Sequence, residues 1–276
     1  MRLGIAVDSR MCMACYCCFM ACKDEHCDND WMPYTRPQPE TGHFWMKVVE
    51  KVRGNVPVVK LSYTPLFCAH CAEAPCMAAA SNDAVYRRDD GLVIIDPEKS
   101  VGQKAIAEAC PIGAIYWNDT YDIPQKCTGC AHLLDDEWKE PRCVDACPTE
   151  ALRFGDEEDF AAEIAQAELL AGTDTCGPRV YYLNLPKRFV AGCMVDRTIN
   201  EVLIGADVLL FNSAGEEVAT TSTDDFGDWK FDQIEPDVYK IRLTMEGYEP
   251  AELEANVTEK DLSLGDFFAH PSPRGA

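Results

Sequence analysis

The chain has 276 residues, of which 47 are acidic and 25 are basic, and its formal net charge is −22. This acidic balance argues against a nucleic-acid partner, and a length above that of one average domain favours two domains. Its 16 cysteines far exceed ordinary usage, and without a secretory signal ahead of them they indicate metal ligands rather than disulfides.

The N-terminal sequence MRLGIAVDSR precedes a cysteine at position 12 so closely that it leaves no room for a secretory signal. The adjacent arginines at 87 and 88 lie deep inside the chain and are no twin-arginine signal. Apolar runs such as GLVII and ADVLLF are too short to span a bilayer. We therefore expect a cytoplasmic protein without a membrane partner.

Two complete cysteine motifs begin and end the cysteine-rich part of the chain. The first is C-x2-C-x2-C-x3-C over residues 12–22, and the last is C-x2-C-x12-C-x3-C over residues 127–147, followed by Pro148. In ferredoxins with two clusters, three cysteines of a motif hold one cluster and the fourth reaches across to the other. Pairing the outer motifs predicts one 4Fe-4S cluster on Cys12, Cys15, Cys18 and Cys147. It predicts a second on Cys127, Cys130, Cys143 and Cys22.

Between them lie two incomplete motifs. The one that begins at Cys68 runs C-x2-C-x4-C and then has Ala80 where a fourth cysteine would stand. The other, SVGQKAIAEACP (100–111), keeps only its fourth cysteine, followed by Pro111. Pairing these motifs predicts a third cluster on Cys68, Cys71, Cys76 and Cys110. The four places of a fourth cluster have all lost their cysteines and hold Ala80, Ser100, Gln103 and Ile106. Because one inner site keeps all four cysteines and the other keeps none, the sequence predicts three clusters and one deleted site.

Other metal chemistries fit the spacing less well. Structural zinc usually uses two separated C-x2-C pairs rather than a triplet and a distant fourth ligand. A radical enzyme that cleaves S-adenosylmethionine would show C-x3-C-x2-C, but its third place here holds Glu25 or Glu150. The sequence has no nucleophile–base pair, Walker loop or dinucleotide fingerprint. We therefore expect no catalytic residues in this chain.

Several residues near the predicted ligands need separate interpretation. We interpret Cys17 as a spectator thiol, because its use in place of Cys18 would break the motif spacing, and Cys193 as a small buried hydrophobic residue in a strand. His70 and His132 are expected to pack or hydrogen-bond near the clusters rather than to bind iron. The sequence identifies no partner for Cys27 or for Cys176.

The end of the cysteine-rich domain is predicted to be helical. The sequence DEEDFAAEIAQAELLAG (156–172) has apolar residues at helical spacing, acidic residues at its start and a final glycine, which predicts one amphipathic helix. The following sequence, TDTCGPRVYYLNLPKR, is rich in turn formers and predicts a connecting strap. We expect this domain to span residues 1–188.

Residues 189–276 are predicted to form a small all-β domain. Alternating runs begin at residues 189, 206, 217, 228, 238, 251 and 262, and turns containing glycine separate several of them. Seven short strands at this spacing favour an antiparallel barrel or sandwich. The predicted fold class is thus α+β, with a double two-cluster ferredoxin-like domain followed by a seven-stranded β-domain.

The motifs CAHCAEAPC, ACPIGAI, QKCTGCAHLL and RCVDACPTEALRFG, in this order, resemble the iron–sulfur subunits of the dimethyl sulfoxide reductase family. The resemblance covers residues 1 to about 190. It implies a heterodimer, with further oligomerisation left open, in which a large catalytic subunit carries molybdenum on two pterin guanine dinucleotides. It also implies that the clusters pass electrons to or from that metal.

Residues 189–276, with GADVLLF and TDDFGDWKF, resemble the carboxypeptidase-regulatory or transthyretin-like family. Three clusters joined to such a domain resemble the small subunits of molybdenum transhydroxylases. This implies a partner that transfers a hydroxyl group between polyhydroxybenzenes, from pyrogallol to phloroglucinol, without net redox change. The alternative is an electron-transfer subunit of a soluble molybdenum reductase for a sulfur, arsenic or oxoanion substrate.

A third hypothesis gives the β-domain a docking role, with Trp229 and Tyr248 as contacts for a partner. Aromatic residues at strand spacing more often belong to a core. A passive domain is therefore the simpler expectation, since likeness of fold carries no function.

Overall fold

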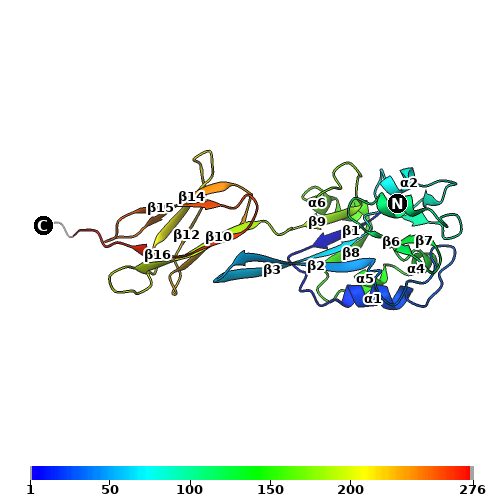
Figure 1. The fold of residues 1–276 in the computed structure, drawn as a ribbon, viewed down its shortest axis with the longest axis horizontal. Helices are drawn as coiled ribbons and strands as arrows, with labels where there is room; N and C mark the ends of the chain where they lie inside the picture. Colours follow the sequence, from blue (N-terminus) through cyan, green and yellow to red (C-terminus); the bar gives the residue numbers. More distant parts are fainter. Residues whose placement is uncertain (1, 274–276) are drawn as a thin grey trace. The chain divides into compact units, whose positions relative to one another are not determined.

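The first part of the chain is organised around a three-stranded sheet (Figure 1). The computed structural model describes residues 2–273, so residues 274–276 of the predicted β-domain lie outside the described part. Strand β1 (Leu3–Asp8) pairs antiparallel with β8 (Leu152–Asp156) and parallel with β9 (Val180–Leu183). The sheet therefore joins the start of the chain to two segments that follow the last cysteine motif.

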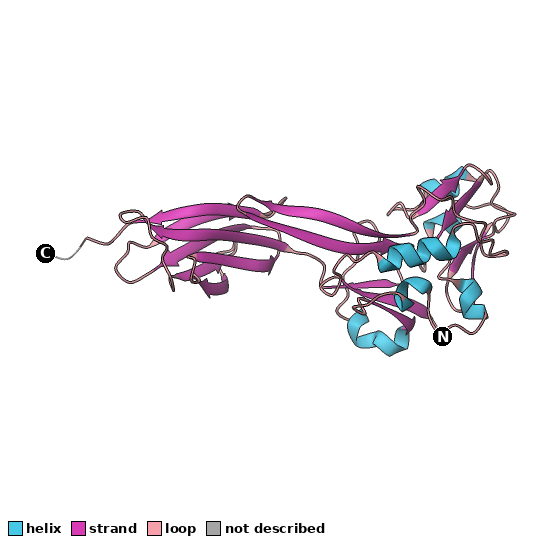
Figure 2. Cartoon of the chain, turned by 90° about the horizontal axis from the view of Figure 1, so that it is seen from below, coloured by secondary structure: helices cyan, strands magenta, loops and turns pink. Residues whose placement is uncertain are grey.

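Short helices and three hairpins surround this sheet. The helices, cyan in Figure 2, are α1 (Cys17–His26), α2 (Pro75–Ala78), α3 (Lys104–Glu108), α4 (Ala131–Asp135), α5 (Arg142–Asp145), the 3₁₀ helix η1 (Glu157–Phe160) and α6 (Ala161–Ile164). The hairpins are β2 (Met46–Asn55) with β3 (Val58–Phe67), β4 (Val85–Arg87) with β5 (Val93–Ile95), and β6 (Ile115–Asn118) with β7 (Ile123–Lys126). Among the described residues, no helix has the length and apolar character needed to cross a bilayer.

The prediction of one helix over 156–172 is wrong. The chain forms only η1 and α6 there, and Phe160 is buried. Beyond α6, Glu168 turns toward β9, because its N–H donates to Tyr182 O at 2.8 Å and its carboxylate accepts the Leu185 N–H at 3.2 Å. Pairing with a strand thus overrides the local helical pattern. The predicted strap also contains a strand, β9.

The C-terminal part contains the seven predicted strands. They are β10 (Arg188–Asp196), β11 (Asp207–Phe211), β12 (Glu217–Ser222), β13 (Asp228–Ile234), β14 (Val238–Thr244), β15 (Ala251–Asn256) and β16 (Leu262–Ala269). Within the described residues they form two sheets, ordered β13-β10-β16 and β12-β11-β14-β15, so the barrel alternative is wrong. The expectation of a wholly antiparallel domain is also wrong, since β10 and β16 run parallel.

The core of this domain is formed by the apolar side chains that alternate with other residues along the strands. Val208 and Leu210 of β11 and Ile241 and Leu243 of β14 are fully buried on one face of their sheet. Trp229 is 3% exposed and belongs to the same core, so it is not available as a docking contact. Tyr248 is half-buried, packs against this core and donates its hydroxyl to Asp196 at 2.6 Å.

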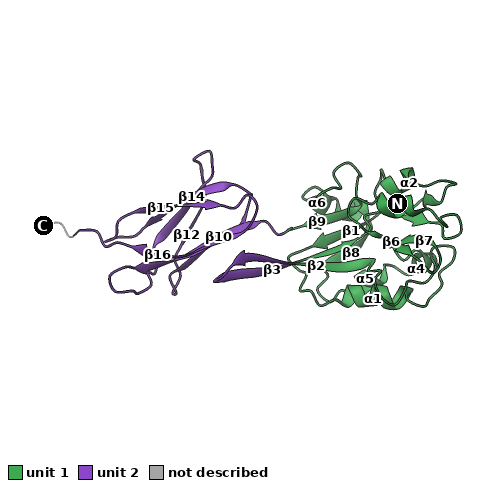
Figure 3. Ribbon diagram, in the orientation of Figure 1, with its two compact units in different colours: residues 1–50, 63–185 green, residues 51–62, 186–276 purple. Residues whose placement is uncertain are grey.

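The described structure divides into two compact units, shown in Figure 3. One comprises residues 1–50 and 63–185, and the other comprises residues 51–62 and 186–276. The outer part of the β2–β3 hairpin therefore packs with the β-domain, which the single predicted boundary after residue 188 did not anticipate. No pattern in the sequence predicts this contact, because its partners are about 130 to 210 residues away along the chain.

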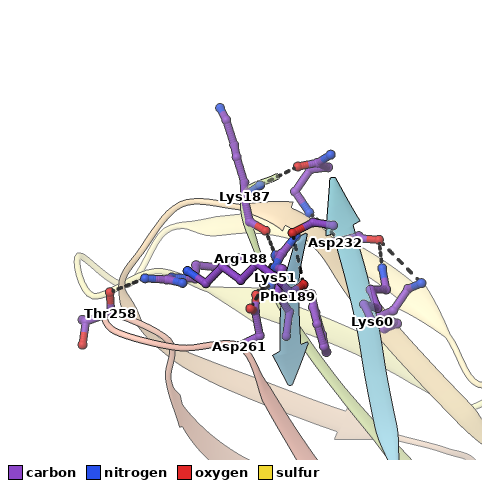
Figure 4. A network of polar contacts seen from close by, with 12 residues as sticks. Lys51, Lys60, Lys187, Arg188, Phe189, Asp232, Thr258 and Asp261 are labelled. Carbon is purple, nitrogen blue, oxygen red and sulfur yellow. Dashed lines mark hydrogen bonds and ion pairs between the residues drawn. The ribbon is translucent and has the colours of Figure 1, made fainter. Parts of the chain in front are cut away.

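A buried ion pair fixes the hairpin within this second unit, in the region shown in Figure 4. Arg53 donates from Nε and Nη2 to the two oxygens of Asp261 at 2.9 and 2.7 Å, and its Nη2 also donates to Lys187 O. Asp261 accepts the Phe189 N–H at 2.9 Å as well. An exposed pair, Lys60 with Asp232, adds a second contact from the hairpin. The aspartate at 261 therefore joins the hairpin to the first strand of the domain.

Gly54 is required where the hairpin crosses Phe189. Its φ is +83°, and an added Cβ would lie 2.5 Å from Phe189 Cζ and 2.5 Å from Val58 O. We expect Gly54→Ala to lower the stability of this unit by about 1–3 kcal/mol beyond the cost of the positive φ. Gly215→Ala is a matched control, because its φ is +82° and nothing lies within 4 Å. Equal losses of stability in denaturant titrations of the two variants would show that crowding at Phe189 is unimportant.

Candidate iron–sulfur centres

Two helical segments each position two predicted ligands that are four residues apart. Cys18 and Cys22 lie in α1, whereas Cys143 lies in α5 and Cys147 follows that helix. Residues four apart face the same side of a helix on successive turns. Because α1 packs against α5, each helix can present one thiol to the first predicted set and one to the second.

The first set converges at the start of α1. Burial raises the pKa of Cys18 to about 11, and the nearby thiols of Cys147, Cys12 and Cys15 add to this effect. The pKa of Cys12 is raised by burial and then by Cys147 and Cys15. Cys15 itself is exposed. The thiols of Cys12 and Cys147, which the pairing rule assigns to one cluster, therefore lie close together in space.

The second set lies deeper in the same unit. Burial, together with the thiols of Cys127 and Cys130, raises the pKa of Cys22 well above its ordinary value. Cys143 behaves in the same way, with Cys130, Cys22 and Cys127 among its neighbours. Each of the four predicted thiols thus faces other members of this set.

The third set lines one cavity. Cys68, Cys71, Cys76 and Cys110 all contribute to its wall, and its empty volume is about 400 Å³ including the part open to solvent. Burial and the thiols of the other three members, together with Cys176, raise the pKa of Cys71 to about 12. The remaining wall is largely apolar, with side chains such as Val93, Ile112 and Ile115.

The three sets form a series. Cys18 of the first set faces Cys22 and Cys143 of the second. At the other end of the second set, Cys127 faces Cys68 of the third. The second set therefore lies between the other two, and the third is the end next to motif positions that lack cysteines, such as Ala80 and Ile106.

The loops that carry these thiols share a backbone conformation. In each motif, the residue two positions after the first cysteine, or after Ser100 in the degenerate motif, has a positive φ. The values are 54° at Ala14, 44° at His70, 76° at Gly102 and 66° at Gly129. Such turns direct backbone N–H groups inward, as seen where Gly129 N–H donates to Cys127 Sγ at 3.3 Å. After the fourth place of the degenerate motif, Ala114 N–H donates to Cys110 Sγ, also at 3.3 Å. Hydrogen bonds of this type tune cluster potentials. Gly102 shows that the degenerate motif keeps the loop geometry.

Other side chains occupy the four motif positions that lack cysteines. Ile106 is fully buried and packs in one hydrophobic cluster with Ala80 and Cys76. Gln103 joins the two motifs, because its Oε1 accepts the Ser81 N–H at 2.8 Å and its Nε2 donates to Ser81 O at 3.3 Å. Ser100, three residues before Gln103, is also fully buried. Four former ligand places are thus used for packing and hydrogen bonds.

The chemistry of the three sets fits 4Fe-4S clusters. Burial raises the pKa of most of these thiols, so the protein alone favours protonated sulfur, whereas iron binding requires thiolates and supplies the compensating positive charge. Within residues 2–273, no three His, Cys, Asp or Glu side chains are close enough to hold a single metal ion. The third set surrounds a cavity instead, which suits a group of several atoms.

Histidines pack around the thiols without joining the sets. His70 is buried and its Nδ1 accepts the Val93 N–H at 3.0 Å, and His132 stacks on Trp31 and contacts Glu25 at 3.0 Å. Sequence reasoning missed His26, whose Nε2 lies 3.8 Å from Cys130 Sγ. Burial lowers the pKa of His26 to about 3, so its imidazole is neutral.

Sequence reasoning also missed a group of cations that are buried or half-buried. Lys126 is 3% exposed, contacts Val93 O, and donates to Cys127 O at 3.0 Å. Although burial acts most strongly to lower its pKa, the thiols of Cys68, Cys76 and Cys127 together raise it. Burial and the charges of Lys126, Arg179 and Arg87 hold the pKa of His70 well below its usual range. The only feature of the sequence that indicated a cation near the predicted clusters was the lysine directly before Cys127.

The cysteines outside the three sets lie in different surroundings. Cys17 is exposed and Cys176 is buried beside Cys71. The expectation that Cys193 is a buried hydrophobic residue is wrong, because it is half-buried and its thiol donates to Phe226 O at 3.6 Å. Cys27 is half-buried and its backbone pairs with Gln38.

Comparisons with known proteins agree with this architecture. Residues 59–157 match the 4Fe-4S dicluster domain, and residues 190–267 match the carboxypeptidase regulatory-like domain. The pyrogallol hydroxytransferase small subunit of Pelobacter acidigallici is 40% identical over 95% of this chain and 97% of its own length. The arsenate respiratory reductase iron–sulfur subunit ArrB of Shewanella sp. (strain ANA-3) is 30% identical over 66% of this chain and 96% of its own length. A polypeptide of the anaerobic dimethyl sulfoxide reductase of Escherichia coli (strain K12) is 33% identical over 56% of this chain and 73% of its own length.

The fold, the cysteine sets and these matches define an iron–sulfur subunit that transfers electrons through 4Fe-4S clusters and accompanies a larger catalytic subunit. The second domain and the match over nearly the whole of both chains narrow the class further. The chain thus belongs to the family of the pyrogallol hydroxytransferase small subunit.

Proposed function

We propose that this chain carries three 4Fe-4S clusters and transfers electrons to or from a large catalytic subunit that holds molybdenum on two pterin guanine dinucleotides. The observation that supports the proposal is that the thiols which the ferredoxin pairing rule groups together lie near one another, in three sets of four. The cysteines would hold the clusters, and the clusters would supply one-electron transfer. The protein would supply burial, N–H donors and separation from water.

We propose further that the large subunit transfers a hydroxyl group between polyhydroxybenzenes, as from pyrogallol to phloroglucinol. The support is the similarity to a pyrogallol hydroxytransferase small subunit along both domains. A reductase for arsenate or another oxoanion is the second candidate, favoured by the match to ArrB, although that match covers only 66% of this chain. Reduction of an added oxoanion by the purified complex with viologen dye would favour the second candidate.

The exposed end of the series is the proposed face toward the large subunit. Cys15 is exposed, and three methionines nearby in sequence, Met11, Met13 and Met20, are 48%, 65% and 59% exposed. A cluster at this position would be open to water and oxygen unless another chain covered it. Apolar, flexible methionines suit such a contact.

The loss of a fourth cluster supports a role as a local electron reservoir. A series of clusters that must reach an external acceptor depends on every member, because electron tunnelling falls steeply with distance. A hydroxyl transfer without net redox change needs no continuous flow of electrons. We propose that the three clusters bring the molybdenum of the partner into its working oxidation state.

The test is the metal content of anaerobically purified protein. We expect about twelve iron and twelve acid-labile sulfide atoms per chain, since each cluster holds four of each, and molybdenum in a large subunit that co-purifies. About sixteen irons would mean that a fourth cluster exists despite the filled site, and the deletion would be refuted. Zinc in place of iron would refute the electron-transfer function.

A further inference from the structure

Three cationic side chains gather around the third thiol set, of which Lys126 and Arg179 are buried and Arg87 is half-buried. Lys126 contacts Val93 O and Cys127 O, and the thiols of Cys68 and Cys76 are among the charges that face it. Arg87 Nη2 donates to the carbonyl oxygens of Cys71 and Ala72 at 2.7 and 2.5 Å. Lys126 therefore faces thiols of the third set, and Arg87 is hydrogen-bonded to the loop that carries Cys71.

Arg179 completes the group. Its backbone N–H donates to Ala69 O at 2.8 Å, and its side chain lies over Gly91, where an added Cβ would be 1.3 Å from Nη1. Its Nε and Nη1 are buried without a hydrogen-bond partner in the described structure, and Glu157 lies 3.8 Å from Nε. Glu157 thus offsets part of the charge of Arg179, whereas the groups facing Lys126 are thiols.

The other two sets have less buried positive charge in their surroundings. Lys126 also faces Cys127 of the second set, and the half-buried Lys23 faces Cys22, but Lys126 faces two thiols of the third set. Next to the second set, Glu25 and Arg142 form an ion pair at 3.4 Å, so their charges largely cancel. The first set includes the exposed Cys15, and water screens charges at an exposed site more strongly than at a buried one. The environment of the third set is therefore the most favourable of the three for added negative charge.

We infer that the cluster on Cys68, Cys71, Cys76 and Cys110 has the highest midpoint potential of the three and that Lys126 is the main residue that raises it. Reduction adds one electron to this cluster and neither forms nor breaks a bond. A fixed positive charge in a buried environment favours the reduced state. Electrons entering at the first set would then come to rest at the opposite end of the series. This inference rests on the proposed function, because it requires a cluster in the third set.

The test is a reductive titration with dithionite, followed by electron paramagnetic resonance, of the chain purified with its large subunit. Lys126→Met removes the charge and keeps most of the volume, Lys126→Arg keeps the charge, and Lys240→Met removes an exposed lysine from the other unit. Arg179→Met is a second neutralising variant in case Lys126→Met does not assemble its clusters. Cys76→Ser identifies the signal of the third set, because only that signal should change or disappear.

We expect the third-set signal to have the highest midpoint in the unmodified protein. In Lys126→Met, its ratio of reduced to oxidised cluster at a fixed potential should fall at least tenfold, which for one electron is a shift of about 59 mV. Arg179→Met should shift it in the same direction by less, and Lys126→Arg and Lys240→Met should leave it nearly unchanged.

Other results would overturn the inference. If the chain contains three clusters but the highest potential belongs to another set, or if Lys126→Met and Arg179→Met shift the signal no more than Lys240→Met does, the assignment to buried cations is wrong while the proposed function stands. If the unmodified protein contains no third-set cluster, both fail.

Discussion

Replacement of Cys71 by serine is expected to reduce the iron content from about twelve to about eight atoms per chain, because a cluster with only three of its four thiolates is poorly held. The thiol lies in the wall of the cavity lined by the third set and faces the other three members of that set. If the clusters act as a reservoir, the variant should need much longer reductive activation, whereas steady hydroxyl transfer after activation should change little. Iron analysis and a time course of activity after addition of reductant measure the two effects.

The control for this prediction is Cys176→Ser. Cys176 is buried next to Cys71 but is not a predicted ligand, so this variant should keep about twelve irons and normal activation. Equal iron loss in the two variants would show that crowding rather than ligation decides cluster assembly. Steady turnover that falls in proportion to electron flow to an added dye would refute the reservoir role.

Replacement of Arg53 by methionine should lower the free energy of unfolding of the C-terminal unit by about 3–5 kcal/mol. Arg53 and Asp261 have side chains that are 8% and 3% exposed, and the pair is bidentate. Removing the guanidinium leaves a buried carboxylate whose remaining described donor is the Phe189 N–H. Hydrogen exchange of strands β10 to β16 in the full-length chain, measured by mass spectrometry across a denaturant series, reports the change.

Two further variants separate the buried pair from general effects of charge. Arg53→Met combined with Asp261→Asn should recover much of the loss, because the amide still accepts the Phe189 N–H and no charge is buried. Arg242→Met removes an ion pair with Glu252 whose side chains are 49% and 59% exposed, and it should cost less than about 1 kcal/mol. A loss from Arg53→Met no larger than from Arg242→Met would mean that the hairpin contributes little to this unit.

At the predicted deleted site, motif spacing is visible in the sequence, whereas packing is visible only in the structure. The positions of Ala80, Ser100, Gln103 and Ile106 follow from counting along a motif, so the absence of four ligands is visible in the sequence. The backbone turn retained at Gly102 and the hydrogen bonds of Gln103 are not visible, because they depend on how the two motifs face each other. Packing in the structure explains how the fold tolerates the missing ligands.

Errors in the sequence-based expectations also have physical causes. Residues 156–172 have helical periodicity, yet contacts of Glu168 with β9 outweigh the weak preference of a short isolated helix. Alternation predicts that strands exist from 189 onward, but it does not specify which edges pair, so the parallel β10–β16 pair was not expected.

The sequence by itself predicted the ligand types, their pairing and three clusters, and it determined the presence of seven strands, because these depend on residue identity and on local spacing. Only the tertiary structure decided which side chains surround those ligands. Lys126, Arg87 and Arg179 come from separate segments, as do Arg53 and Asp261. Cluster potential and domain stability depend on charges held a few ångströms apart in a buried environment, and such distances are fixed by the packing of remote segments rather than by order along the chain.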